Sequence, residues 1–156
     1  MKKKIKIELF EEHEKVNFYT LRIEDEDAEI EKFLKKFPSG CEFDEDIQII
    51  IKWIDKIGSI GALERYFRPE GKCYDNVSAI PIDVSKLRLY LLRISESIII
   101  LGNGDIKTTK TYNEDYTLNS IVELLQSVDS FIKSRLERGS LTIKNRVFKG
   151  NVTLYY

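Results

Sequence analysis

The chain has 156 residues, of which 42% are hydrophobic and 33% are charged, and its formal net charge is −1. These proportions are typical of a globular domain that buries its own core, which excludes a disordered or fibrous chain. No apolar run is long enough to cross a bilayer, and no signal-peptide core follows the first lysines. We therefore expect one cytoplasmic domain that spans 1–156 and makes no contact with a membrane.

The sequence offers few ligands for a metal ion and few partners for a nucleophile. It holds two cysteines, Cys41 and Cys73, and one histidine, His13. The spacing of these residues matches neither a zinc site nor a disulfide framework. His13 lies in a charged stretch that is typical of a hairpin loop, which weakens the case for a Ser-His or Cys-His arrangement. The expectation is a protein without a metal or a cofactor.

Charge is distributed unevenly along the chain. Residues 1–60 carry 11 Lys or Arg against 15 Asp or Glu, whereas residues 61–156 carry 14 against 11. The small net charge argues against strong general affinity for nucleic acid. A site for a polyanion is therefore expected in the later part of the chain.

The first sixty residues predict a β-hairpin followed by two helices. Residues 4–9 alternate apolar and charged side chains, and residues 16–23 form a second run of strand-forming residues. Residues 26–37 and 44–57 carry apolar side chains at helical spacing, and Gly58 is expected to end the second helix. The apolar arc of that helix is so wide that most of the helix must be buried.

The later residues predict a meander of antiparallel strands and a long helix. A short helical turn is expected within 60–67, before runs rich in branched residues at 77–82, 87–94 and 97–101. Gly102-Asn103-Gly104-Asp105 is expected to break the sheet. The longest helix should cover 117–138 and end at Gly139. Short edge strands are expected at 141–143 and 152–155.

Side chains of the strand 87–94 should divide between its two faces. Leu87, Leu89 and Leu91 share one face with Arg93, and Arg88 shares the other with Tyr90 and Leu92. The leucines predict that their face is the buried one. Arg88 and Tyr90 are therefore expected to point outward.

The segment from Leu87 to Asp115, LRLYLLRISESIIILGNGDIKTTKTYNED, resembles the signature half of the RelE/ParE-like toxins. In that superfamily a strand with an Arg followed by an aromatic residue forms a hairpin with a hydrophobic strand. The second strand ends in a basic, Thr-containing segment, and a helix follows. Here Arg88 and Tyr90 match the first strand, 98–101 the second and 107–111 the basic segment.

The resemblance covers about residues 44–138, because Tyr66-Phe67-Arg68-Pro69 also matches in kind. It implies an α+β domain, with a twisted antiparallel sheet and about three helices packed against it. The amino-terminal hairpin and the residues beyond Gly139 would be additions to that domain. By function, the resemblance implies the toxin-like component of a type II toxin–antitoxin system, a metal-independent endoribonuclease that cleaves ribosome-bound mRNA. A small cognate antitoxin would be its partner.

Cleavage of RNA without a metal needs cations against the phosphate, a base near the 2′-hydroxyl and an acid near the leaving oxygen. Arg88 and Lys107 are the candidates for stabilising the phosphate, because an arginine fork pairs with two phosphate oxygens. Proton transfer falls to Lys110 or Tyr112. The candidate substrate-binding residues are Arg65, Arg68, Tyr90 and Tyr116.

Each assignment has a plainer alternative. Arg88 could be a solvated strand charge, and Lys107 and Lys110 could guard a sheet edge. The tyrosines could pack against neighbours, and Arg65 and Arg68 could be surface residues of a turn. For the whole chain, the alternative is a non-enzymatic ParE-like inhibitor of DNA gyrase or a phage-type protein-interaction domain, which the small net charge favours. The catalytic hypothesis requires the named cations to gather in one concavity.

Overall fold

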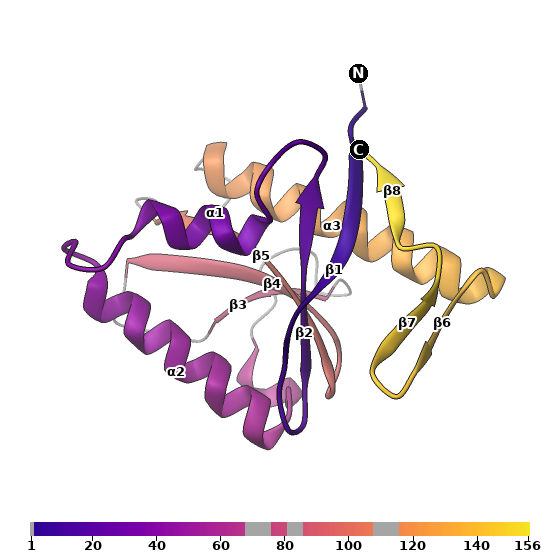
Figure 1. Cartoon of the computed structure of the whole chain (residues 1–156), viewed down its shortest axis with the longest axis horizontal. Coiled ribbons are helices and arrows are strands. Elements are labelled where there is room, and N and C mark those ends of the chain that lie inside the picture. The colour runs from indigo at the N-terminus through magenta and orange to yellow at the C-terminus, as the bar shows by residue number, and fades with distance from the viewer. Residues whose placement is uncertain (1, 68–75, 81–85, 108–115) are drawn as a thin grey trace.

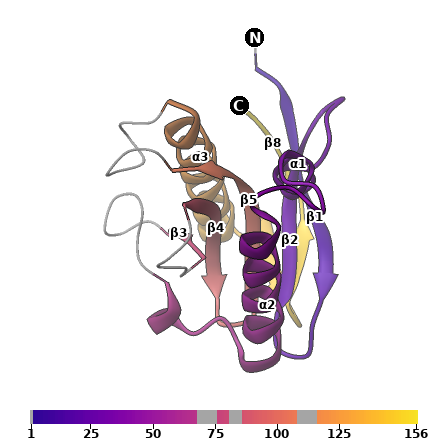
Figure 2. The ribbon, with the colours of Figure 1, turned by 90° about the vertical axis from the view of Figure 1, so that its left-hand side faces the viewer.

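A β-sheet forms the centre of the molecule, with helices on both of its faces (Figures 1 and 2). The structure is a computed structural model that describes residues 2–67, 76–80, 86–107 and 116–156. In these ranges six strands pair in the order β3-β4-β5-β2-β1-β8. They are β1 (Lys4–Glu12), β2 (Asn17–Ile23), β3 (Val77–Ala79), β4 (Leu87–Ser95), β5 (Ile98–Ile106) and β8 (Thr153–Tyr155).

Three helices of the described chain enclose the sheet: α1 (Glu29–Lys36), α2 (Asp44–Ile60) and α3 (Tyr116–Arg138). The cores of the two faces show the layering, because one contains side chains of α1 and α2 and the other contains side chains of α3. This arrangement confirms the α+β class. In the described ranges, no helix is long and apolar enough to cross a membrane.

The prediction of a purely antiparallel sheet is wrong, because β2 runs parallel to β5. Asn17–Thr20 lies opposite Ile98–Leu101 in this pairing, whereas the other neighbouring strands of the sheet are antiparallel. The predicted β1–β2 hairpin is present. It is not an addition at the margin, however, since β2 lies between β5 and β1. Five successive residues of β2, Asn17 to Leu21, are buried, as expected for a strand covered on both faces.

β4 is also buried on both faces. Leu87, Leu89 and Leu91 pack in the core under α1 and α2, as predicted. Tyr90 lies in the other core, under α3, with a relative exposure of 0%. The expectation that Tyr90 points to solvent is therefore wrong, because the strand pattern could not show that α3 covers the second face. Arg88, near the start of the strand, is half-buried.

The predicted break at 102–105 does not occur, and β5 continues to Ile106. Its glycines allow close approach. A Cβ atom at Gly104 would lie 1.9 Å from the carbonyl oxygen of Arg88, and one at Gly102 would lie 3.0 Å from a terminal carbon of Leu125 on α3. Gly102 and Gly104, which in the sequence are typical of a loop, are thus required for the packing of β5 against α3 and β4.

The helices and the short strands follow the predictions, with shifted ends. α2 does not stop at Gly58, which is buried against His13, and continues to Ile60 before Gly61 with φ 118°. The predicted short helical turn is the 3-10 helix η1 (Glu64–Tyr66). The two expected short strands prove to be three: β6 (Leu141–Lys144) and β7 (Val147–Gly150) form a hairpin of their own, and β8 joins the main sheet.

Ion pairs join the loop before α1 to the helix itself and to Lys3, just before β1. Glu26 accepts hydrogen bonds from Lys32 and, at 3.1 Å, from Lys3. Asp27 accepts one from Lys35 at 2.6 Å. The hydrogen bonds from Lys32 and Lys3 hold the pKa of Glu26 below its ordinary value, and the hydrogen bond from Lys35 lowers the pKa of Asp27.

These contacts predict a loss of stability in acid. Because the folded-state pKa of Glu26 lies below its unfolded value, its contribution is complete above about pH 5 and is lost as the pH falls through the folded value. Between about pH 7 and pH 3, a Glu26→Gln variant should therefore lose less free energy of unfolding than the wild type. Urea denaturation at both pH values measures this difference. Glu12→Gln, at an exposed end of β1, is the control and should lose as much as the wild type.

Candidate nucleic-acid interface

Two of the predicted catalytic residues lie at the same end of the β4–β5 pair. Arg88 is opposite Asp105 in the strand register. Just past the last residue pair of the two strands, Leu87 and Ile106, the backbone N–H of Lys107 donates to the carbonyl oxygen of Lys86 at 2.7 Å. Nη1 of Arg88 donates to the carbonyl oxygen of Leu87 at 2.9 Å. Lys86 is exposed, and Arg88 and Lys107 are half-buried.

A fourth cation reaches this end from the last turn of α1. Nζ of Lys36 donates to the carbonyl oxygen of Gly104 at 2.8 Å and to Oδ1 of Asn103 at 3.2 Å, and it lies 3.4 Å from Oδ2 of Asp105. The pairing of β2 with β5 stops at Leu101, so the edge of β5 beyond it is open to α1. Lys36 thus supplies a donor where the neighbouring strand has ended.

We name Lys36, Lys86, Arg88 and Lys107 the β4–β5 basic end. Asp105 is the acid among them, because it lies opposite Arg88 and beside Lys36. Among the described residues named here, four cations thus accompany one carboxylate, although the whole chain has a net charge of −1. Such a local excess attracts phosphate groups. The half-buried Arg88 is suited to hold one in a defined orientation, since its planar fork presents parallel donors.

Arg65 does not join this group. The segment before η1 is held at the β4–β5 turn, because the N–H of Ala62 donates to the carbonyl oxygen of Glu96 at 2.7 Å. Arg88 lies at the other end of β4, roughly 23 Å of strand away from Ser95. Arg65 instead lies over the ring of Tyr66, 5.3 Å from its centroid, beside the pair of Lys56 and Trp53 on α2. The predicted concavity shared by Arg65 and Arg88 is therefore absent.

The predicted aromatic residues differ in their surroundings. Tyr116 is the first residue of α3 and is 89% exposed, so it is not packed in the core. Tyr90 is buried and has no surface for a substrate, which corrects its assignment as a substrate-binding residue. The remaining predicted site residues, Arg68, Lys110 and Tyr112, lie outside the described residues.

His13 has a packing role in the structure. Its ring contacts Phe18 edge to face, with 5.0 Å between centroids, and its Nε2 lies 3.0 Å from Oε1 of Glu11. In the described ranges, no group of three or more His, Cys, Asp or Glu side chains is placed to hold a metal ion.

Sequence reasoning missed Lys36 and Lys86. Lys36 follows Lys35 in the last turn of a helix, where a cation is explained by the helix dipole alone. Nothing in the sequence indicates that its ammonium group contacts β5, about seventy residues later. Lys86 directly precedes β4, and only the pairing of β4 with β5 brings it beside Lys107.

No family model matches the chain, and neither a curated protein nor a solved structure matches it.

Proposed function

We propose that the protein is a toxin-like component of a type II toxin–antitoxin system, an endoribonuclease that acts on ribosome-bound mRNA. The observation that supports this function best is the β4–β5 basic end, where Arg88 and Lys107 lie together with Lys36 and Lys86. The order of elements agrees with the RelE/ParE-like resemblance, since a helix, a three-strand meander and a second helix follow one another from Asp44 to Arg138.

The proposed roles follow from the chemistry of each group. Arg88 binds the phosphate that the 2′-hydroxyl attacks and whose bond to the leaving 5′-oxygen is broken, because its fork pairs with two oxygens and remains charged throughout the reaction. Lys107 neutralises the charge that develops on the phosphoryl oxygens. Lys110 or Tyr112, which follow Lys107 closely in the sequence, move the protons of the 2′-hydroxyl and the leaving oxygen.

A direct test is purification of the protein and its incubation with ribosomes that carry a defined mRNA. We expect cleavage within the ribosome-bound codon without an added metal, detected by primer extension. The same protein is added to a DNA gyrase supercoiling reaction. Cleavage with normal supercoiling supports the proposal. Intact mRNA with blocked supercoiling contradicts it and supports the gyrase alternative.

One observation favours that alternative, a non-enzymatic ParE-like inhibitor that acts through protein contacts. One flank of α2 exposes Ile49 and Ile60, with exposures of 36% and 48%, and carries the half-buried Trp53 between them. Exposed apolar side chains along one flank of a helix are more typical of a protein interface than of an RNA-binding surface. Under either function we propose a small antitoxin as partner. Its co-expression should restore the growth that the toxin alone arrests.

A further inference from the structure

The outer edge of β8 has backbone groups that are directed away from the sheet. In the described chain β8 pairs with β1 alone. The pair Lys3 and Tyr156 exchanges two backbone hydrogen bonds, each 2.9 Å long. Hydrogen-bonded and non-bonded pairs alternate along an antiparallel ladder, so the neighbouring pair, Lys4 and Tyr155, is non-bonded. The N–H and C=O of Tyr155 therefore point away from β1.

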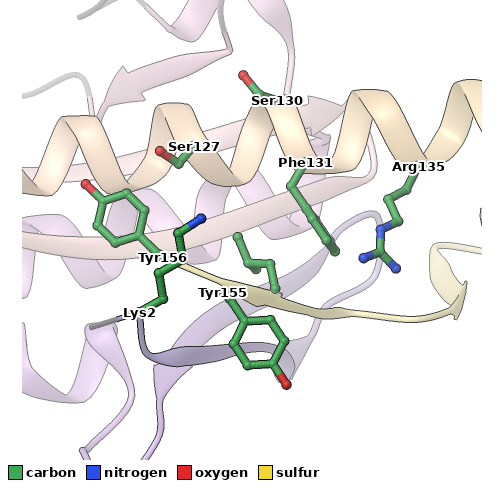
Figure 3. Close-up of a pocket in the computed structure, with 8 residues that line it drawn as sticks. Lys2, Ser127, Ser130, Phe131, Arg135, Tyr155 and Tyr156 are labelled. Atoms are coloured by element: carbon green, nitrogen blue, oxygen red, sulfur yellow. The ribbon is translucent and has the colours of Figure 1, made fainter.

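A groove lies along this edge. Figure 1 shows α3 crossing behind β1 and β8 and continuing beyond β8. Between helix and strand is a hollow of about 660 Å³, shown in Figure 3, whose lining includes Ser127, Phe131 and Arg135 of α3, Leu154 of β8 and Tyr156, which follows β8. The edge of the sheet thus has one helix beside it, and a strand added next to β8 would lie against that helix.

The groove is basic. Lys2 and Arg135 are among its lining residues, and none of the lining residues is acidic. The guanidinium of Arg135 lies 4.4 Å from the centroid of the Phe131 ring. Its Nε is buried and has no hydrogen-bond acceptor among the described residues. An anionic group in the groove would supply an acceptor for this guanidinium and a counter-charge for Lys2.

The edge carries no lysine or proline, but β8 is short and the N–H of Thr153 already donates to Oδ1 of Asn151 at 2.9 Å, so Tyr155 is the residue of β8 that is open to strand addition. Exposed edges are commonly blocked by lysine, proline or a bulge, but residues 152–156 read Val-Thr-Leu-Tyr-Tyr. Tyr155 and Tyr156 are 64% and 45% exposed. At the opposite edge of the sheet, all three residues of β3 are buried. Strand addition is therefore open at β8 and not at β3.

We propose that the outer edge of β8 binds an extended, acidic peptide segment of a partner protein, which adds a strand to the sheet beside α3. Backbone hydrogen bonds to Tyr155 fix the segment, as in other cases of β-strand addition. Alternate side chains of the segment face α3, where carboxylates pair with Arg135 and Lys2. This inference is independent of the proposed function, because β8 and Arg135 lie outside the β4–β5 basic end.

The probe is a capped hexapeptide of alternating Val and Glu, titrated into the isotope-labelled full chain and followed by amide NMR shifts. We expect saturable shifts at Tyr155 and along Ser127 to Arg135, with slowed hydrogen exchange of the Tyr155 amide. The matched peptide with Lys in place of Glu should bind at least about tenfold more weakly, since its charge repels Arg135 and Lys2.

Two variants test separately the backbone hydrogen bond at Tyr155 and the positive charges of Arg135 and Lys2. Tyr155→Pro removes the outward N–H, together with a side chain that lines the groove, and should abolish the shifts, whereas Arg135→Gln with Lys2→Gln should remove the preference for Glu over Lys. Their folding is checked by the unchanged spectrum of the distant strands. The proposal is overturned if the hexapeptide leaves β8 unshifted at millimolar concentration, or if both peptides bind equally. It is also overturned if inorganic phosphate alone reproduces the shifts, or if β8 shifts with protein concentration alone, which would identify a second copy as the occupant.

Discussion

Replacing both Arg88 and Lys107 with alanine is expected to weaken the binding of single-stranded RNA by about 100-fold and to remove growth arrest on induced expression. Each lost charge-assisted hydrogen bond to phosphate costs about 1.5 kcal/mol, and 1.4 kcal/mol corresponds to about tenfold. Fluorescence anisotropy with a labelled RNA at fixed salt measures the binding. The slope of log Kd against log salt concentration should also fall, by roughly one for each lost phosphate contact.

A matched control removes two cations elsewhere. Arg138 and Lys149 are exposed residues at the end of α3 and in β7. Their double alanine variant has the same net charge as the first but keeps the β4–β5 basic end. It should bind RNA within a few-fold of the wild type and still arrest growth. Arrest that persists in the Arg88 and Lys107 variant, with folding confirmed by urea denaturation, would show that the catalytic assignment is wrong.

A Gly104→Ala substitution should lower the free energy of unfolding by about 3 kcal/mol or more. The added Cβ would lie 1.9 Å from the carbonyl oxygen of Arg88 and 2.9 Å from the Cα atom of Leu89. Both atoms belong to the backbone of β4, which cannot move aside without breaking its pairing with β5. Urea denaturation of the purified variant measures the loss.

Gly102→Ala is the comparison for this effect. There the nearest atom, at 3.0 Å, is a terminal methyl carbon of Leu125, which can shift, and the carbonyl oxygen of Tyr90 lies at 3.1 Å. We expect a loss of about 1 kcal/mol. If Gly104→Ala is no more destabilising than Gly102→Ala, β5 does not approach β4 as closely as described. The idea that 102–105 is a break in the sheet would then regain support.

Local patterns were sufficient to predict most elements of the fold. Period-two alternation predicted the β1–β2 hairpin, helical spacing predicted α1, α2 and α3, and branched residues between turn signals predicted β3, β4 and β5. These features depend on neighbours a few residues apart. The glycines led to a wrong prediction. Gly104 allows close packing against β4 and Gly102 against α3, but two glycines so close in the sequence are also typical of a turn.

Part of the candidate site could also be predicted. Arg88 and Lys107 lie at the same end of the β4–β5 pair, since they are close to the two ends of one hairpin and its register brings such residues side by side. Arg65 was grouped with them wrongly. Its position depends on a contact between Ala62 and Glu96 at the far turn of the same hairpin, and no local pattern reports such a contact.

The sequence by itself determined the strands and helices, and the residues that meet within one hairpin, because these depend on short-range periodicity and turn chemistry. The tertiary structure alone decided the parallel pairing of β2 with β5, the burial of Tyr90 under α3 and the contact of Lys36 with β5. Each of these joins segments that are far apart in the chain. Their association depends on packing, which favours whichever arrangement covers both faces of the sheet.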